Sequence, residues 1–334
     1  MKFRSKFAAI VGSAVLITAL AACSTGTSTG TKTAAPGHAK LTIGLVMLEA
    51  DPYFQGISTT LAADVKADGG TVIATTSNND AGTEATNVQN LISRNVDAII
   101  MQPVDDVASL ATMKLVTAAH IPLICYGNCL GGPASPSVVE GVVQSDNTAL
   151  GTGTGVLAAK YIKAKLGGSA NIGILNCDVA SACKLRKAGF KKALSDAGVK
   201  ATYVADQAGY IADAATTTGT NMISANPSIN LIWTSNDGGT EGGVVAVQQS
   251  GKKIVVFGTD IATQIAGYLL DPKDILQATT GQDSHGTANT AYKMAQNAVA
   301  KKKNVPFDVE LPGVTYDRAV TAPINAFIAA NPSN

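Results

Sequence analysis

Carboxylate and amide side chains recur just after short apolar runs along this 334-residue chain. The residues at these positions are Asp51, Gln102, Asn128, the loop at 177–184, Asn236 with Asp237, Asp260 and Gln282. A carboxylate accepts several hydroxyl hydrogen bonds and an amide both donates and accepts, so the set suits a small molecule with many hydroxyl groups. Each residue taken alone could instead cap the helix that follows it. Because so many of them follow a predicted strand, a shared binding site is favoured over a set of unrelated helix caps.

Aromatic side chains occur at the same kind of position. Tyr53 and Phe54 follow the first apolar run, Tyr126 ends a later one, and Tyr210 opens a predicted helix. An aromatic ring can stack on the C–H face of a sugar. Tyr53 also lies at helical spacing from the apolar residues at 57 and 61, so core packing is an open alternative for it.

Strand and helix patterns alternate through the body of the chain. Residues 41–48 are continuously apolar, and a helical pattern with a four-residue period then ends at Gly69-Gly70. The alternation continues to 125, and a second series begins near 138, after Gly131-Gly132-Pro133. We predict an α/β fold of two doubly wound parallel sheets, in which ligands bind beyond the carboxyl ends of the strands.

Composition excludes several classes of protein. Hydrophobic residues make up 46% and charged residues 15%, too apolar for a disordered chain. Lys plus Arg number 25 against 24 Asp plus Glu, without long runs of one sign, which argues against nucleic acid as a partner. The chain has no nucleophile elbow, no His-based metal pair and no dinucleotide-binding glycine motif after a strand. We therefore predict no enzyme activity, no metal and no cofactor.

The amino terminus has the pattern of an export signal. Lys2, Arg4 and Lys6 precede an apolar stretch at 7–20, and Leu20-Ala21-Ala22-Cys23 resembles a bacterial lipobox. We predict a lipoprotein signal peptide at 1–22, acylation of Cys23, a flexible tether at 23–39, and anchoring by lipid to the outer face of the cell membrane. An ordinary cleaved signal with a chance cysteine is the alternative.

Four further cysteines follow at 125, 129, 177 and 183. Outside the cytoplasm an even number favours disulfides, and the close spacings favour Cys125 with Cys129 and Cys177 with Cys183. A zinc site and free buried thiols stay open as alternatives.

Several short stretches together resemble a known family. They include Asp51-Pro52-Tyr53-Phe54, Gln102-Pro103-Val104-Asp105, Ser145-Asp146-Asn147, Phe257-Gly258-Thr259-Asp260 and Thr280-Gly281-Gln282. From 43 to about 309 the chain resembles the ribose- and galactose-type periplasmic sugar-binding proteins, the solute receptors of ABC importers. The resemblance implies a type I periplasmic-binding-protein fold with three hinge crossings, near Ser145, Gln282 and Leu311. Lobe 1 would comprise 40–144 plus 283–309, and lobe 2 would comprise 145–282 plus 310–334.

The family's binding positions carry over with some changes. Tyr53 and Phe54 keep the aromatics, while Asp51 and Gln102 each replace an asparagine. An Asp-Arg pair would fall at Gly127-Asn128, where neither member is present. Lys184 would take the place of an arginine, with Arg186 one turn along, and Tyr210 would take that of a stacking Phe. Asn236, Asp260 and Gln282 match. We expect Asp260→Ala to abolish binding, since ligand hydroxyls would be buried without their acceptor, and Arg186→Ala to change it little.

We therefore expect a monomeric solute-binding lipoprotein that delivers a small neutral sugar or polyol to an ABC permease with its ATPase. Its contact with the membrane would be through the lipid anchor only. Without the Asp-Arg pair, a linear polyol or an uncommon monosaccharide is favoured over ribose, and a neutral ligand over a sugar acid or phosphate. The alternative function is a signalling receptor, for a quorum-sensing furanone or for a sensor kinase.

Overall fold

The computed structural model describes residues 40–50, 52–105, 107–127, 129 and 135–331. The predicted signal peptide, the tether with Cys23, and the two predicted site residues Asp51 and Asn128 lie outside the described residues.

The first sheet has six parallel strands in the order β11-β5-β4-β3-β1-β2. Its strands are β1 (Thr42–Met47), β2 (Thr71–Thr76), β3 (Ala98–Met101), β4 (Leu123–Tyr126), β5 (Gly141–Ser145) and β11 (Asp308–Leu311). The accompanying helices are α1 (Pro52–Ala67), α2 (Ala81–Ser93), α3 (Ser109–Ala118), α4 (Ser135–Val138) and α10 (Ser284–Val299). The strand expected from 138 therefore begins at Gly141, and it belongs to this first sheet.

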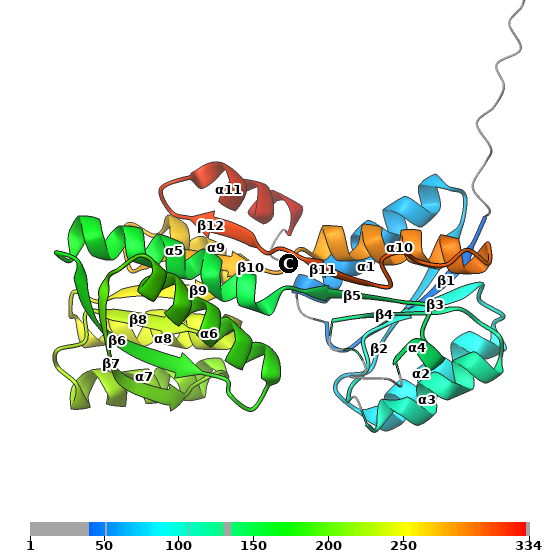
Figure 1. Ribbon diagram of the computed structural model, residues 1–334, viewed down its shortest axis with the longest axis horizontal. Coiled ribbons are helices and arrows are strands. Elements are labelled where there is room, and N and C mark those ends of the chain that lie inside the picture. The colour runs from blue at the N-terminus through cyan, green and yellow to red at the C-terminus, as the bar shows by residue number, and fades with distance from the viewer. Residues whose placement is uncertain (1–39, 51, 106, 128, 130–134, 332–334) are drawn as a thin grey trace, which may run out of the picture. The chain divides into compact units, whose positions relative to one another are not determined.

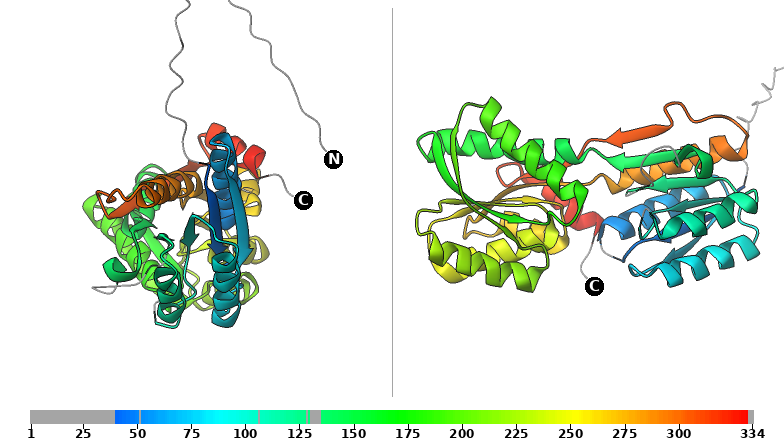
Figure 2. Two further views of the ribbon diagram at one scale, coloured as in Figure 1. Left: turned by 90° about the vertical axis from the view of Figure 1, so that its right-hand side faces the viewer. Right: turned by 60° about the horizontal axis from the view of Figure 1, so that its bottom comes forward.

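The second sheet has the order β12-β10-β9-β8-β6-β7, with β12 antiparallel to β10 and the other pairs parallel. Its strands are β6 (Ser169–Asn176), β7 (Lys200–Ala208), β8 (Leu231–Thr234), β9 (Val255–Thr259), β10 (Leu276–Gly281) and β12 (Val314–Asp317). Its helices are α5 (Asn147–Lys165), α6 (Ser181–Asp196), α7 (Ala212–Ala225), α8 (Asp237–Ser250), α9 (Thr263–Leu270) and α11 (Thr321–Ala330). Helices cover both faces of each sheet (Figure 1; Figure 2).

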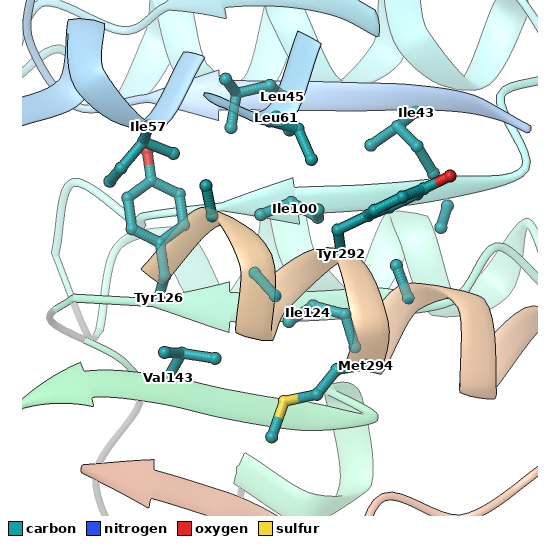
Figure 3. Close-up of a cluster of buried hydrophobic side chains, with 14 of the residues drawn as sticks. Ile43, Leu45, Ile57, Leu61, Ile100, Ile124, Tyr126, Val143, Tyr292 and Met294 are labelled. Carbon is teal, nitrogen blue, oxygen red and sulfur yellow. The ribbon is translucent and has the colours of Figure 1, made fainter. Parts of the chain in front are cut away.

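Burial explains why these segments take these forms. Strand β1 is buried along almost its whole length, because α1 and α10 pack on one face of its sheet and α2 and α3 on the other. Helix α1 buries Phe54, Ile57, Leu61 and Val65 on one face. Figure 3 shows this face of the core. Ile57 and Leu61 of α1 and Tyr292 and Met294 of α10 belong to one cluster with buried residues of the strands.

The described chain passes between the two sheets three times. It passes from β5 to α5, from β10 to α10, and from β11 to β12. Asp146 and Asp283 cap the helices that begin after the first two passages, each accepting a backbone N–H at 2.8 Å. Ser145 Oγ donates to Gln282 Oε1 at 3.1 Å and so links these two passages. The predicted fold class, two doubly wound lobes with a three-crossing hinge, is confirmed.

None of the helices in the described part of the chain is both long and apolar enough to cross a membrane.

Candidate functional site

A cleft of ≈ 380 Å³ lies where loops from the carboxyl ends of both sheets meet. Volumes of this size are usual for small-molecule sites. Seven of the predicted ligand residues line it: Tyr53, Phe54, Gln102, Tyr210, Asn236, Asp260 and Gln282. The structure thus brings together residues that are spread over most of the chain.

On the first-sheet side, Gln102 and two aromatic rings line the cleft. The rings of Tyr53 and Phe54 meet edge to face with centroids 5.2 Å apart. Gln102 follows β3 and is almost buried, and Gly127 follows β4 with a φ of +66°. A Cβ atom at 127 would overlap Oε1 of Gln102. The glycine therefore makes room for the longer amide side chain of Gln102.

On the second-sheet side, a buried ion pair joins Arg186 and Asp260. Arg186 Nη1 donates to Asp260 Oδ2 at 2.7 Å and to the Ser235 carbonyl at 3.1 Å, while Nε donates to Asn147 Oδ1 at 3.0 Å. The side chain of Arg186 is 7% exposed and that of Asp260 18%. The guanidinium is thus fixed in place by three partners before any ligand arrives.

Asp260 lines the cleft, and one of its carboxylate oxygens is buried. It follows β9 with a φ of +69°, in the left-handed region, and its Oδ1 is buried without a hydrogen-bond partner in the described structure. Burial raises the pKa of this carboxyl, the Arg186 charge opposes the rise, and the Asp237 charge adds to it. A buried acceptor without a partner costs free energy, which a ligand hydroxyl would recover.

Asn236 has a structural role as well as a place in the cleft. Its Oδ1 accepts from Gly239 N at 3.1 Å, which caps α8, and its Nδ2 donates to the Tyr210 carbonyl at 2.8 Å. Asn236 therefore does cap a helix, as the alternative interpretation held, and its second hydrogen bond holds the Tyr210 loop beside it.

Two predicted site residues lie elsewhere. Tyr126 is fully buried, and its hydroxyl donates to the Val46 carbonyl at 3.3 Å, so it belongs to the core between the first sheet and its helices. Lys184 is exposed and does not line the cleft, whereas Arg186 does. Two positions along a helix turn a side chain by about 200°, so these residues lie on opposite sides of α6. Among the described residues, Arg186 and not Lys184 is the cation that lines the cleft.

Comparison with known proteins identifies the family. The protein-family model described as periplasmic binding protein domain matches residues 43–303 of this chain. This chain belongs to the periplasmic binding protein family. Its members are exported proteins that bind solutes for transport, which confirms the prediction of a binding protein rather than an enzyme.

Individual relatives of this periplasmic binding protein cover most of its length. The ABC transporter periplasmic-binding protein YphF of Escherichia coli (strain K12) is 29% identical over 283 residues, 84% of this chain and 86% of that one. The ribose import binding protein RbsB of Bacillus subtilis (strain 168) is 29% identical over 288 residues, 85% and 90% of the two chains. A solute-binding protein from Actinobacillus succinogenes 130z, solved with bound D-allose, has a TM-score of 0.73 at 25% identity, covering 85% of this chain and 100% of its own.

Sequence reasoning missed some residues that line the cleft of this periplasmic binding protein. Arg186 shares a helix face with the buried Phe190 and Ala193, at spacings of four and seven, and this periodicity could have placed it inward. Asn147, in the quoted Ser145-Asp146-Asn147 stretch, also lines the cleft, as does Glu49, which carries no pattern that separates it from surface carboxylates. Asp237, which the strand-end pattern did include together with Asn236, lines the cleft as well.

The structure of this periplasmic binding protein contains both favoured disulfides. Cys125 pairs with Cys129 across a Cα–Cα distance of 5.8 Å, and Cys177 with Cys183 across 5.5 Å. The second pair lines the cleft just before Arg186, and Cys177 N donates to Ser235 Oγ at 2.9 Å. No group of three or more His, Cys, Asp or Glu residues within the described ranges could hold a metal ion.

Proposed function

We propose that this periplasmic binding protein captures a small neutral polyhydroxylated ligand, a monosaccharide or a polyol, and delivers it to an ABC permease with its ATPase. The observation that carries the proposal is the buried, unpartnered Oδ1 of Asp260 beside Arg186. The amides of Gln102, Asn236 and Gln282 supply further donors and acceptors around the same cleft. Asp51 and Asn128 remain proposed ligand residues from the sequence.

Charge favours a neutral ligand. Among the described residues that line the cleft, the carboxylates of Glu49, Asp237 and Asp260 outnumber the single cation Arg186, which is already paired. An anionic sugar acid or phosphate would bring a like charge into this partly desolvated space. The missing Asp-Arg pair at Gly127-Asn128 further supports an uncommon monosaccharide or polyol over ribose.

Uptake is favoured over signalling as the role. One relative is named for ribose import and another as part of an ABC transporter. We propose that the mature protein is a monomer, anchored through acylated Cys23 to the outer face of the membrane. The proposed lobe boundaries are 40–144 plus 283–309 and 145–282 plus 310–334.

A thermal-shift screen of the mature protein without Cys23 tests the proposal. A ligand at 100 times its Kd should stabilise the folded state by about 2.7 kcal/mol through mass action. We expect at least one neutral monosaccharide or polyol to raise the melting temperature, and the Asp260→Asn variant to lose this response. Stabilisation by sugar acids or phosphates alone would overturn the proposal.

A further inference from the structure

A small cavity of ≈ 90 Å³ adjoins the cleft near the ends of β9 and β10. We call it the side chamber. Its lining shares four residues with the cleft, namely Tyr53, Asp237, Asp260 and Gln282. Its remaining lining residues are Pro52, Ile261, Ser284 and Phe327. One water molecule needs about 10–15 Å³ by this kind of measure, so the chamber has room for a small substituent of a ligand held at Asp260.

The side chain that closes the chamber comes from the end of the chain. Phe327 lies on α11, beyond residue 303, where the match to the family model ends. Helix α11 packs against α9 and β12 and lies beside β12 in Figure 1. This helix lies outside the residues that the family model matches.

The position of Phe327 is well defined by its neighbours. Ile324, one turn earlier, is fully buried, and the Phe327 ring meets the Tyr316 ring edge to face at 5.7 Å. Beyond the end of the helix, the Asn331 carbonyl accepts from Thr263 Oγ1 at 3.1 Å. Residues on both sides of Phe327 thus hold the ring in place against the second sheet.

The two ends of the chamber differ in chemistry. Asp237, Asp260 and Gln282 offer polar atoms on the side shared with the cleft. Ile261 and Phe327 add apolar walls. A Cβ at Gly281 would overlap the Ile261 side chain, so the glycine after Thr280 allows Ile261 to lie this close to β10. A group with one carbon and one hydroxyl would find both kinds of partner here.

We propose that the side chamber is an extension of the ligand site, closed by Phe327, that accepts a hydroxymethyl group on the sugar ring. The protein then prefers a hexose to the pentose that lacks this group. The inference rests on the proposed function, since it needs a sugar bound at Asp260. Phe327 is a specificity-determining residue in this arrangement.

Calorimetry with matched sugar pairs tests the inference on the mature protein. D-Allose and D-ribose, D-glucose and D-xylose, and D-galactose and L-arabinose differ in their pyranose forms only by the hydroxymethyl group. For the pair that binds, we expect the wild type to prefer the hexose about tenfold, which is within the range for a small group in a fitted pocket. Phe327→Trp should fill the chamber and remove most of this preference, because it should lower the hexose affinity about tenfold more than the pentose affinity.

Two further variants complete the experiment. Ala329→Trp adds the same side chain at an exposed position of α11 and should leave the preference as in the wild type. Phe327→Leu enlarges the chamber, and we expect it to raise the affinity for the 6-O-methyl derivative of the bound hexose about tenfold relative to wild type. This gain can be measured even where the Trp variant does not fold.

The outcomes separate the two proposals. Binding of none of these sugars, nor of any other neutral sugar or polyol, by the wild type would overturn the proposed function and the inference with it. Binding of a neutral polyol or another sugar but of none of these pairs, sugar binding with no hexose preference, or ratios that neither Phe327 variant changes would each overturn the inference alone.

Discussion

At the scale of single residues, the Arg186–Asp260 pair governs the site. Arg186→Ala leaves the Asp260 carboxylate buried without its 2.7 Å partner, and Asp260→Asn removes the charge that holds the guanidinium. We expect each change to weaken ligand binding by about 2–3 kcal/mol, the usual effect of losing a hydrogen bond to a charged group. Calorimetry with the ligand found in the screen measures this loss.

This expectation replaces the one drawn from the sequence, that Arg186→Ala would change binding little. The exposed Lys184 provides the matched control, because Lys184→Ala removes a cation two positions away without touching the cleft. Wild-type affinity in the Arg186→Ala variant would show that the pair does not contribute to binding.

A second residue, Glu84, should give stability a pH dependence. It is fully buried, and its Oε2 accepts from Val104 N at 2.7 Å and Ser109 Oγ at 3.0 Å, while Oε1 has no partner in the described structure. Burial raises the pKa of this carboxyl, against the lowering effect of both hydrogen bonds. A carboxyl with a raised folded-state pKa stabilises the fold at low pH and loses that contribution as pH rises through the folded pKa.

Glu84→Gln keeps an oxygen for both hydrogen bonds and removes the charge. We therefore expect the difference in melting temperature, variant minus wild type, to increase as the pH is raised from about 4 to about 7. A change of 1 kcal/mol would shift the melting temperature by about 2–4 °C in a domain of 150–250 residues. Parallel melting curves of the two proteins that show a constant difference across this range would contradict the prediction.

At the scale of elements, the Cys177–Cys183 disulfide connects the residue after β6 to the first turn of α6. Helix α6 also carries Arg186. Replacing both cysteines with serine should lower the free energy of unfolding by about 2 kcal/mol, from the loop entropy of a short ring in the unfolded chain. We also expect weaker ligand binding, since the bond holds one wall of the cleft. Urea unfolding and calorimetry measure the two effects.

The control for this double variant is made in a Cys125→Ser, Cys129→Ser background, because the Cys125–Cys129 disulfide would also be reduced. In that background a reductant should reproduce both losses, and the variant that also lacks Cys177 and Cys183 should not respond to it. Equal stability of the oxidised wild type and the serine variant would contradict the loop-entropy argument.

At the scale of the whole molecule, the proposed lipid anchor determines where the protein is found. One acyl chain binds a membrane only marginally, so stable anchoring needs the multiple acylation of bacterial lipoproteins. Cys23→Ala should release soluble protein into the medium, detected by fractionation of expressing cells. Retention of the variant in the membrane fraction would refute the anchor, and Cys125→Ser with Cys129→Ser controls for general effects of losing cysteines.

The sequence by itself determined the features that depend on local pattern. Apolar runs alternating with helical periodicity were enough to predict two doubly wound lobes. Which residue follows a strand can also be read from the local sequence. Because parallel strands end at one edge of a sheet, Gln102, Asn236, Asp260 and Gln282 could be placed in the cleft. Short spacing favoured the two observed disulfides for the same reason.

The tertiary structure decided what depends on packing between distant segments. Tyr126 ends a strand, close to the kind of position held by the residues that line the cleft, yet packing between the first sheet and its helices buries it completely. The inward position of Arg186 depends on which face of α6 packs against the second lobe, and a change of two positions reverses that face. Phe327 reaches the side chamber because α11 packs back on β12 and on α9, and the contact with α9 is a long-range one that no local pattern around residue 327 encodes.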